Sequence, residues 1–335
     1  MSLKDIVGQD RAVRLLHELI SEDHAGGSYL FIGPRGVGKR TVSIEAAKAI
    51  NCEKKGLDAC EECVSCGKIN SSNHPDVFII QKEIGSSFIK IDKIRNIIYQ
   101  AGMKPYEAGK KIFIITNAED MNEESQNALL KILEEPRENQ IFILTSSRIS
   151  GILATVVSRC KTVKFNLLSQ VQIQRFLVER RGFEESKAIL FSHMALGSLG
   201  RAIAFKENDE IRERDKMLND FFFKKRAIFR EEVCDEKKYA DLEESLGMLL
   251  SWYRDLLVSK FTEDKNIFLN VDRMEEIFSY SAGFSADKLE KDISSVMDTI
   301  NHVRRNVNPK MALFNMALEL WSLSGMKAGV SRAEY

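Results

Sequence analysis

The segment that most limits how this chain can fold is GPRGVGKRT at residues 33–41. It follows a β-rich run, SYLFI (28–32), and precedes a helical run, TVSIEAAKAI (41–50). In such a strand–loop–helix context, glycines let backbone N–H groups curl around phosphate oxygens at the positive end of the helix. The spacing Gly33-x4-Gly38-Lys39 therefore predicts a phosphate-binding loop at the edge of an α/β sheet.

Further short apolar runs alternate with helical patterns in the first half of the chain. The runs are VFII (77–80), KIFIIT (111–116) and IFILTS (141–146), and EESQNALLKILEE (123–135) reads as a helix that Pro136 closes. Alternating strands and helices favour a parallel sheet with helices on both faces. The first half is therefore predicted to be an α/β domain.

From about residue 166 the pattern becomes helical. Apolar residues recur at the 3.6-residue spacing of a helix-bundle core, in two sets: Leu242, Leu246, Leu249, Tyr253 and Leu256, and Ile293, Val296, Met297 and Ile300. The charged stretch at residues 206–220 reads as a solvated helix or linker.

Length and composition limit the class of protein. The 335 residues suffice for two or three domains, and 44% hydrophobic with 29% charged residues is typical of a globular chain. The formal net charge is zero, so any nucleic-acid contact must come from a local patch. No run approaches the roughly 18 apolar residues of a membrane span, and the N-terminus lacks an apolar signal region. We expect a cytoplasmic location.

The phosphate loop predicts nucleotide binding more strongly than hydrolysis. Lys39 would neutralise charge on the β and γ phosphates, but Arg40 stands where a Ser or Thr usually holds magnesium. Thr41 cannot replace that hydroxyl, because one residue along a helix is a turn of about 100°. A vestigial loop that keeps its turn without binding is the alternative. The candidate contacts are Gly33, Pro34, Arg35, Gly36, Val37, Gly38, Lys39, Arg40 and Thr41.

Hydrolysis also requires an acid pair at the end of a neighbouring strand, one for magnesium and one for the attacking water. After the apolar run that starts at Lys111, Thr116 and Asn117 occupy those positions. Glu119 and Asp120 follow on the turn. We therefore expect no ATPase activity from this chain. An ATPase that uses Glu119 or Asp120 after a shift of strand register remains the alternative.

Four cysteines fall within a short Lys/Glu-rich segment, with the spacing C-x7-C-x2-C-x2-C: Cys52, Cys60, Cys63 and Cys66. In a reducing compartment such a group favours a closed, structural tetrahedral Zn²⁺ site over four unrelated thiols. Cys160 and Cys234 stand alone and need no role beyond packing.

Arg159, in Ser158-Arg159-Cys160, lies at a corner between a helical and a strand-like run. It could point to a neighbour's nucleotide and stabilise phosphoryl-transfer charge in trans, or be an ordinary surface arginine.

These features together resemble the bacterial clamp-loader subunits of DNA polymerase III, members of the AAA+ family. The matching stretches are IVGQD (6–10), YLFIGPRGVGKRT (29–41), the four cysteines, NAEDMNEESQNALLKILEEPRENQIFIL (117–144) and TSSRISGILATVVSRC (145–160). The resemblance spans about residues 1–205, and residues 304–320 look like the end of the family's helical collar. It implies a nucleotide-binding domain at 1–165 with a zinc module at 52–66, a helical lid at 166–205, and a helical collar for pentamer assembly at 206–335.

The family has two kinds of subunit with this zinc module. The gamma/tau ATPase keeps a full phosphate loop and an acid pair, whereas the other kind has lost catalysis and supplies an arginine finger to its neighbour. With Arg40 and Thr116-Asn117, this sequence is similar to the second kind. By matching position Arg159 would be the finger, Ser146 or Ser147 would fall in the sensor-1 region, and Arg201 in the sensor-2 region, unless Arg201 is a solvated helix residue.

The resemblance implies a function in DNA replication. The chain would form part of a hetero-oligomeric ring that opens the sliding clamp and places it on primed DNA for the replicative polymerase. The implied partners are gamma/tau and delta subunits, the clamp, and primed DNA through the assembled complex, with residues 84–98 a candidate for clamp or DNA proximity. Zn²⁺ is the expected cofactor, and ATP and ADP are candidates for the loop. A gamma/tau-like ATPase is the alternative; a free-standing zinc-dependent DNA-binding module is disfavoured by the balanced charge and the lack of an aromatic-plus-basic cluster.

Overall fold

The computed structural model describes residues 2–21, 26–83, 85–86, 88–205, 209–219, 239–304 and 307–321. The chain separates into two compact units. The first unit consists of residues 1–182 with 195–202, and the second of 183–194 with 203–335. The finer division into a nucleotide-binding domain, a lid and a collar stays a prediction.

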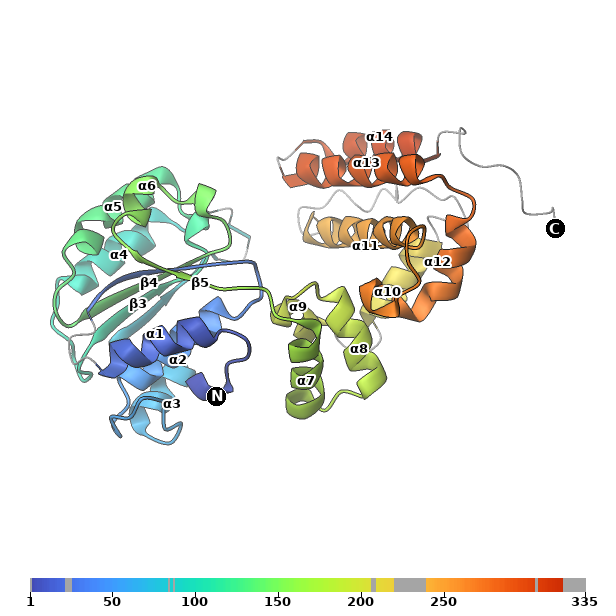
Figure 1. Ribbon diagram of the computed structural model, residues 1–335. Coiled ribbons are helices and arrows are strands. Elements are labelled where there is room, and N and C mark those ends of the chain that lie inside the picture. Colours follow the sequence, from blue (N-terminus) through green and yellow to red (C-terminus); the bar gives the residue numbers. More distant parts are fainter. Residues whose placement is uncertain are drawn as a thin grey trace. The chain divides into compact units, whose positions relative to one another are not determined.

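A five-stranded parallel sheet forms the centre of the first unit (Figure 1). Its strands lie in the order β2-β3-β4-β1-β5, and each neighbouring pair is parallel. Their bounds are β1 (Gly27–Ile32), β2 (Val77–Ile80), β3 (Lys111–Ile115), β4 (Gln140–Ser146) and β5 (Lys161–Lys164). The strands expected from the four apolar runs are confirmed, and so is the α/β fold class.

Helices cover both faces of this sheet. In Figure 1, α1 and α2 lie on one face and α4, α5 and α6 on the other. The sheet is buried from both sides, so its central strands are continuously apolar rather than alternating; Phe113 of β3 stacks on Phe142 of β4 with ring centroids 4.8 Å apart. The helices are α1 (Asp10–Ser21), α2 (Lys39–Ile50), α3 (Val64–Asn70), α4 (Ile91–Ala101), α5 (Glu123–Glu134), α6 (Ala154–Val157) and α7 (Gln170–Arg181), with short 3₁₀ turns η1 (Leu3–Asp5), η2 (Ala118–Asp120) and η3 (Ile149–Gly151).

The second unit is helical. Its helices are α8 (Glu185–Met194), α10 (Asp209–Leu218), α11 (Tyr239–Val258), α12 (Met274–Ser281), α13 (Ala286–Arg304) and α14 (Pro309–Trp321), and α9 (Leu199–Ala204) begins in the first unit. The predicted stripe from Leu242 to Leu256 is buried in its core. Met297 is a wrong prediction, with 50% of its surface exposed. It directly follows the buried Val296, and one residue turns the side chain about 100° away from the core.

The charged stretch at 206–220 forms α10 over residues 209–218, whereas 206–208 and 220 lie outside the described residues. The expectation of a solvated segment is wrong for Arg214, which is fully buried. Its guanidinium binds the carboxylates of Asp215 and Asp272, with Nη2 2.8 Å from Asp215 Oδ1 and Nη1 3.0 Å from Asp272 Oδ1. A buried charge requires such partners.

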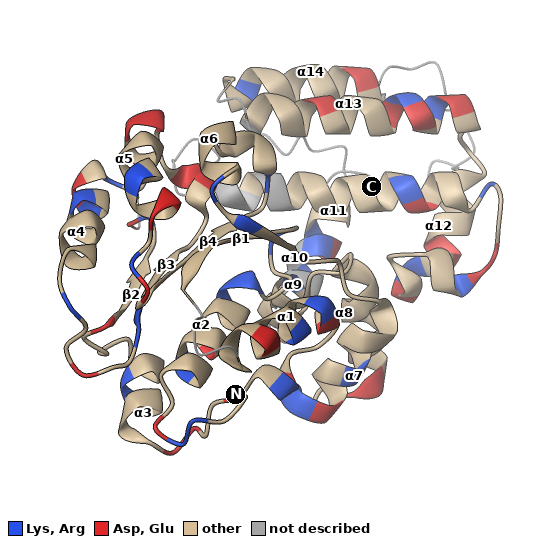
Figure 2. Ribbon diagram, turned by 60° about the vertical axis from the view of Figure 1, so that its left-hand side comes forward, with Lys and Arg blue, Asp and Glu red and all other residues tan. Residues whose placement is uncertain are grey.

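Charge is mixed over the chain. Figure 2 shows acidic and basic segments interspersed along the helices of each unit, in keeping with 49 residues of each sign. Among the described residues, none of the helices combines the length and the apolar character needed to cross a membrane.

Candidate nucleotide site and metal centre

The phosphate loop joins β1 to α2 and depends on its glycines. Gly36 and Gly38 adopt φ angles of 73° and 98°, in the left-handed region that favours glycine. Gly33 has a different reason: a Cβ there would lie 2.3 Å from the carbonyl oxygen of Phe165. The loop therefore has the shape that the sequence predicted.

Lys39 is folded into its own loop. Its Nζ donates hydrogen bonds to the carbonyl oxygens of Gly33 and Pro34, both at 2.6 Å. Burial lowers the pKa of Lys39 to about 8; the negative charge of Glu119 opposes this shift, and Arg35 adds to it. In this arrangement, the loop's own carbonyls satisfy the charge that a bound phosphate would otherwise satisfy.

The end of β3 carries no acid pair. Thr116 turns its hydroxyl to the neighbouring strand, where Oγ1 donates to Ile80 O at 3.0 Å. Asn117 turns the chain with φ of 52°, and its N–H donates to Thr145 Oγ1 at 3.1 Å. Thr116 and Asn117 thus stand at the two positions after the strand where the sequence analysis looked for a metal-binding and a water-positioning carboxylate.

A carboxylate nevertheless reaches this edge of the sheet, from η2. Glu119 Oε1 accepts hydrogen bonds from Ser147 N at 3.0 Å and Ser147 Oγ at 2.5 Å. The backbone oxygen of Ser146, one residue earlier, accepts a hydrogen bond from the N–H of Gly33 at 3.2 Å. Burial would raise the pKa of Glu119, but the Ser147 donors outweigh it and the pKa is lowered. Its other oxygen, Oε2, is buried with no hydrogen-bond partner among the described residues.

The serines of the predicted sensor-1 region are engaged within the chain. Ser146 Oγ donates to Arg148 O at 2.9 Å, and Ser147 holds Glu119. Asp120 is the other acid that the sequence analysis named as a candidate for hydrolysis. Its carboxylate forms an ion pair with Lys82 at 3.6 Å.

The sequence did not predict that the Ser198–Arg201 segment packs on the phosphate loop. Gly200 N donates to Gly36 O at 2.7 Å, and a Cβ on Gly36 would lie 2.1 Å from Ser198 Oγ. Two glycines thus permit a backbone-to-backbone contact, and Arg201, the sensor-2 candidate, follows directly. The short GSLG pattern at 197–200 is the feature of the sequence from which this contact could have been predicted.

Arg159 follows the short helix α6 and pairs within its own chain. Its Nε and Nη2 lie 2.9 Å and 2.8 Å from Glu134 Oε2, and Nη1 donates to Thr155 O at 3.0 Å. The Arg159 side chain is 29% exposed and that of Glu134 is 56% exposed. The candidate finger is therefore at the surface, held by a partner that solvent also reaches.

The four predicted cysteines converge. Their sulfur atoms all lie within 4.8 Å of one another, and the thiols are free. The N–H of Cys63 donates to Cys60 Sγ at 3.3 Å, and that of Cys66 to Cys63 Sγ at 3.4 Å. Zn–S bonds of about 2.3 Å place tetrahedral sulfurs roughly 3.8 Å apart. The four thiols thus fit a structural metal such as zinc, if their sulfur atoms move slightly closer together.

The cysteine segment has little apolar core of its own. Its buried cluster consists of Cys52, Ala59 and Cys66, with Cys60 and Cys63 packed against it. Polar contacts attach it to the domain: Asp58 accepts hydrogen bonds from Leu3 N at 2.8 Å and Lys4 N at 3.2 Å. Buried Lys48 of α2 pairs with Glu61 at 2.6 Å. Cys160 is buried in the main core, and Cys234 lies outside the described residues.

The chain is similar in sequence to subunits of DNA polymerase III. The family model described as DNA polymerase III, delta subunit, matches residues 8–169, and the model of the C-terminal part of the delta subunit matches 208–321. The delta-prime subunit of Bacillus subtilis DNA polymerase III is 30% identical over 325 residues, covering 93% of this chain and 96% of the relative. The tau subunit of that organism is 30% identical over 279 residues, covering 78% of this chain and 48% of its own length. A solved Thermotoga maritima protein related to the gamma subunit has 19% identity and a TM-score of 0.45, over 92% of this chain and 98% of its own.

The parallel sheet, the phosphate loop at its carboxyl edge and the four-cysteine insert define an AAA+-like subunit of the clamp-loader type. The length that is matched separates the two kinds of subunit. The similarity to the delta-prime relative extends over nearly the full length of both chains, whereas the tau relative is matched over only about half of its length. The chain belongs to the delta-prime subunit family of bacterial DNA polymerase III.

Proposed function

We propose that this chain is a non-hydrolysing subunit of the bacterial clamp loader, which helps to place the sliding clamp on primed DNA. The observation that carries the proposal is the end of β3, where Thr116 and Asn117 replace the acid pair and Thr116 is hydrogen-bonded to the next strand. Arg40 replaces the magnesium-binding hydroxyl and is exposed. A site without these groups lacks the parts that activate water.

Arg159 is the proposed contribution to chemistry, acting on a nucleotide held by a neighbouring gamma/tau subunit. To reach that nucleotide it must leave Glu134, and an exposed ion pair is worth only about 0–1 kcal/mol. A phosphate group offers the guanidinium a more highly charged, bidentate partner. The exchange of Glu134 for phosphate is therefore favourable, and Glu134 holds the arginine at the surface until the neighbour binds nucleotide.

The cysteine cluster is proposed to hold one structural Zn²⁺, with Cys52, Cys60, Cys63 and Cys66 as its ligands. When bound, zinc supplies the folding energy that the segment's small apolar cluster does not. The site has no open position for a substrate, since all four protein ligands converge. Its role is to hold the segment that Asp58 and Lys48 attach to the domain.

Nucleotide at the phosphate loop is proposed to be optional. ATP or ADP would have to draw Lys39 Nζ away from the carbonyls of Gly33 and Pro34. The proposed partners are gamma/tau and delta subunits and the clamp, with DNA reached through the assembled ring. Residues 166–205 would act as the lid and 206–335 as the collar of that ring.

The test is ATP hydrolysis by a reconstituted loader that contains Arg159→Ala. Loss of an arginine finger costs about 10³–10⁵ in rate, so the adjacent ATPase site should be silenced while the complex still assembles. Arg175→Ala is the matched control, because Arg175 also forms a surface ion pair, with Glu179 at 2.8 Å. Hydrolysis at the unmodified rate with Arg159→Ala would remove the proposed role.

One observation favours a second candidate, an intrinsic ATPase. Glu119 places a buried carboxylate, with one oxygen unpartnered among the described residues, beside the phosphate loop. Steady ATP turnover by the purified chain, abolished by both Lys39→Ala and Glu119→Gln, would establish that activity. Absence of turnover, both alone and with partners mutated at their own sites, would support the non-hydrolysing function.

A further inference from the structure

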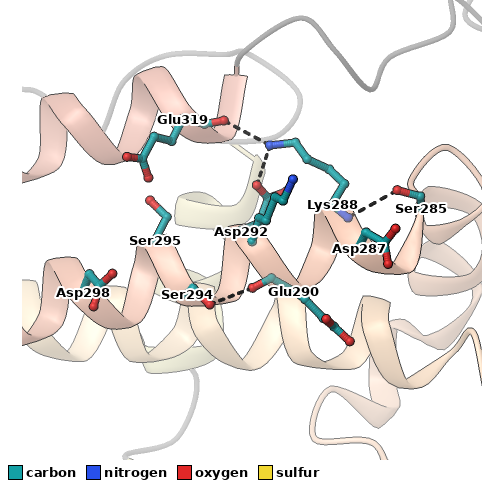
Figure 3. Close-up of a pocket in the computed structure, with 10 residues that line it drawn as sticks. Ser285, Asp287, Lys288, Glu290, Asp292, Ser294, Ser295, Asp298 and Glu319 are labelled. Carbon is teal, nitrogen blue, oxygen red and sulfur yellow. Dashed lines mark hydrogen bonds and ion pairs between the residues drawn. The ribbon is translucent and has the colours of Figure 1, made fainter.

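Charged side chains line a groove of about 1070 Å³ that runs along α13 beside α14 in the helical unit (Figure 3). Its most buried acid, Asp292, is 1% exposed and accepts a hydrogen bond from Lys288 Nζ at 2.6 Å. The charge of that carboxylate is therefore balanced by a lysine one turn earlier on the same helix. The cations of the phosphate loop are arranged differently, because two of them have no partner among the described residues.

Arg35 and Arg40 are exposed arginines on either side of Lys39. Neither guanidinium forms a hydrogen bond or an ion pair with another residue in the described part of the chain. Other exposed arginines of the same unit are paired: Arg175 binds Glu179 at 2.8 Å, and Arg180 binds Asp5 at 2.9 Å. Arg35 is also close enough to Lys39 for its positive charge to lower the pKa of that lysine. The phosphate loop therefore gathers positive charge that no described partner neutralises.

The backbone of the loop is arranged to receive an anion. The carbonyl oxygen of Gly36 accepts a hydrogen bond from Gly200 N at 2.7 Å, and that of Val37 accepts one from Gln9 Nε2 at 3.3 Å. Both carbonyls are thus held by residues outside the loop. The N–H groups of Gly36 and Gly38 donate to no other residue within the described ranges. N–H groups in such a positive-φ turn form a concave nest that binds anions.

Glu119 gives a second, independent indication of a ligand at this loop. It is 8% exposed, and its Oε2 is buried with no hydrogen-bond partner among the described residues. Its negative charge raises the pKa of Lys39, so the two side chains are close. An anion that draws the Lys39 ammonium away from the carbonyls of Gly33 and Pro34 lets that ammonium donate to Glu119 as well. Binding of an anion thereby offsets the cost of a buried carboxylate oxygen that lacks a donor.

We propose that the phosphate loop binds a diphosphate group without Mg²⁺, and that the Arg40 guanidinium takes the place of the metal ion. The inference rests on the proposed function, in which nucleotide at this loop is optional. Arg35, Lys39 and Arg40 together exceed the charge of Glu119, so the loop has the positive charge that a metal-free diphosphate requires. A guanidinium binds phosphate oxygens through two parallel N–H donors. Mg²⁺ fits less well, because position 40 offers no hydroxyl and the end of β3 no acid pair.

Titration calorimetry of the purified chain with ADP and with inorganic pyrophosphate, each in EDTA and in excess Mg²⁺, tests the proposal. Both ligands should bind in EDTA, and Mg²⁺ should leave each Kd unchanged or weaken it, because the metal competes with Arg40 for the same oxygens. Arg40→Ser restores a hydroxyl and removes the guanidinium, so the metal-free Kd should rise about 10-fold to 100-fold. Arg175→Ser, an exposed arginine on α7, is the matched control and should change neither Kd. Both arginines are exposed, so an unchanged melting temperature verifies that each variant folds.

The two ligands distinguish the source of the diphosphate group. Binding of ADP about 10-fold or more tighter than pyrophosphate assigns a nucleoside diphosphate, and equal affinity assigns the diphosphate group alone.

Three results would overturn the inference: no binding of either ligand, an unchanged metal-free Kd in Arg40→Ser, or binding that requires Mg²⁺ and is lost in Glu119→Gln. Without ATP turnover by the purified chain, each of them leaves the proposed non-hydrolysing function intact. Steady Mg²⁺-dependent turnover at this loop would overturn both the proposed function and this inference.

Discussion

Arg159 and Glu134 form an ion pair in which Nε and Nη2 of the guanidinium lie 2.9 Å and 2.8 Å from a single carboxylate oxygen, Oε2. Both nitrogens therefore bind the same carboxylate oxygen, which is not the two-oxygen clamp that a guanidinium can form with a carboxylate. The pair joins the end of α5 to the corner after α6, two segments of the same unit. A partner that presents two or three oxygens in a plane would bind this arginine better than Glu134 does.

Glu134→Gln should therefore release Arg159 without impairing the loader. We expect ATP hydrolysis by the reconstituted complex to be unchanged or raised by up to about 5-fold, because a surface ion pair is worth at most about 1 kcal/mol. The measurement is steady-state phosphate release at saturating ATP and primed DNA. Glu135→Gln, the next residue and also exposed, is the control. A large loss of activity in Glu134→Gln alone would mean that the carboxylate orients the arginine during catalysis.

Removal of zinc should unfold the cysteine segment but leave the sheet folded. Cys66→Ser should reduce bound zinc from one ion per chain to none by elemental analysis, and should expose the amides of residues 52–66 to hydrogen exchange. The physical reason is the small apolar cluster of this segment, which cannot replace metal–ligand bonds. Cys160→Ala, a buried thiol of the main core, should keep one zinc. Full zinc content in Cys66→Ser would contradict the four-ligand assignment.

The sequence predicted the fold where local patterns determine it. The apolar runs became β1 to β4 within one residue at each end, because strands buried on both faces need continuous apolar residues. Single residues were harder to predict. Arg214 can be buried because it pairs with Asp272, a residue 58 positions away in the sequence. No local pattern predicts such a pairing. Met297 failed because two adjacent apolar residues cannot both face one core.

The residues of the candidate site also fall into two groups: those that a short sequence pattern predicts, and those that only the completed fold brings together. The phosphate loop and the four cysteines are short-range patterns. The spacing of the cysteines alone predicted that they converge, whereas nucleotide binding at the loop stays a prediction. Glu119 and Ser147 meet because β3 and β4 are neighbours in a parallel sheet, and the sequence does not give the strand order. The contact between Gly36 and Gly200 joins residues 164 positions apart, and it likewise depends on the completed fold.

Lys39 should titrate near pH 8, well below an ordinary lysine, because burial disfavours its charged form. Its positive charge is then lost as the pH rises through about 8, and any affinity of the loop for ADP should fall between pH 7 and pH 9. Since the Glu119 carboxylate supports the charge, Glu119→Gln should lower the pKa of Lys39 further. NMR titration of isotope-labelled lysine side chains measures both values.

Asp120→Asn is the control for that titration. Asp120 pairs with Lys82 at 3.6 Å and does not contribute to the pKa of Lys39. Its removal should leave the Lys39 pKa where it is. A Lys39 pKa above 10, or one that Glu119→Gln does not change, would show that the ammonium is solvated rather than held inside the loop.

Asp76 should be a major stabilising residue of the first unit. Fully buried, it accepts hydrogen bonds from the backbone N–H groups of Tyr106, Glu107 and Ala108, at 2.8 Å, 2.9 Å and 2.9 Å. Asp76→Asn keeps one acceptor oxygen but presents an N–H₂ group to the remaining donors. We expect a loss of about 2–4 kcal/mol in the free energy of unfolding at pH 7, whereas Asp92→Asn, on the exposed face of α4, should cost almost nothing.

The pH dependence of that difference identifies its cause. Burial would raise the pKa of Asp76, but the three N–H donors outweigh it, so the folded-state pKa lies below the unfolded value of about 3.8. The charged carboxylate therefore stabilises the fold fully above that unfolded value, and the contribution is lost as the pH falls through the folded-state pKa. Urea unfolding should show a constant gap between the unmodified chain and Asp76→Asn from pH 7 to about 5, which narrows below pH 4. Protonation of zinc ligands affects both chains alike, so a gap that stays constant down to pH 3 would mean that shape, not charge, stabilises the 106–108 turn.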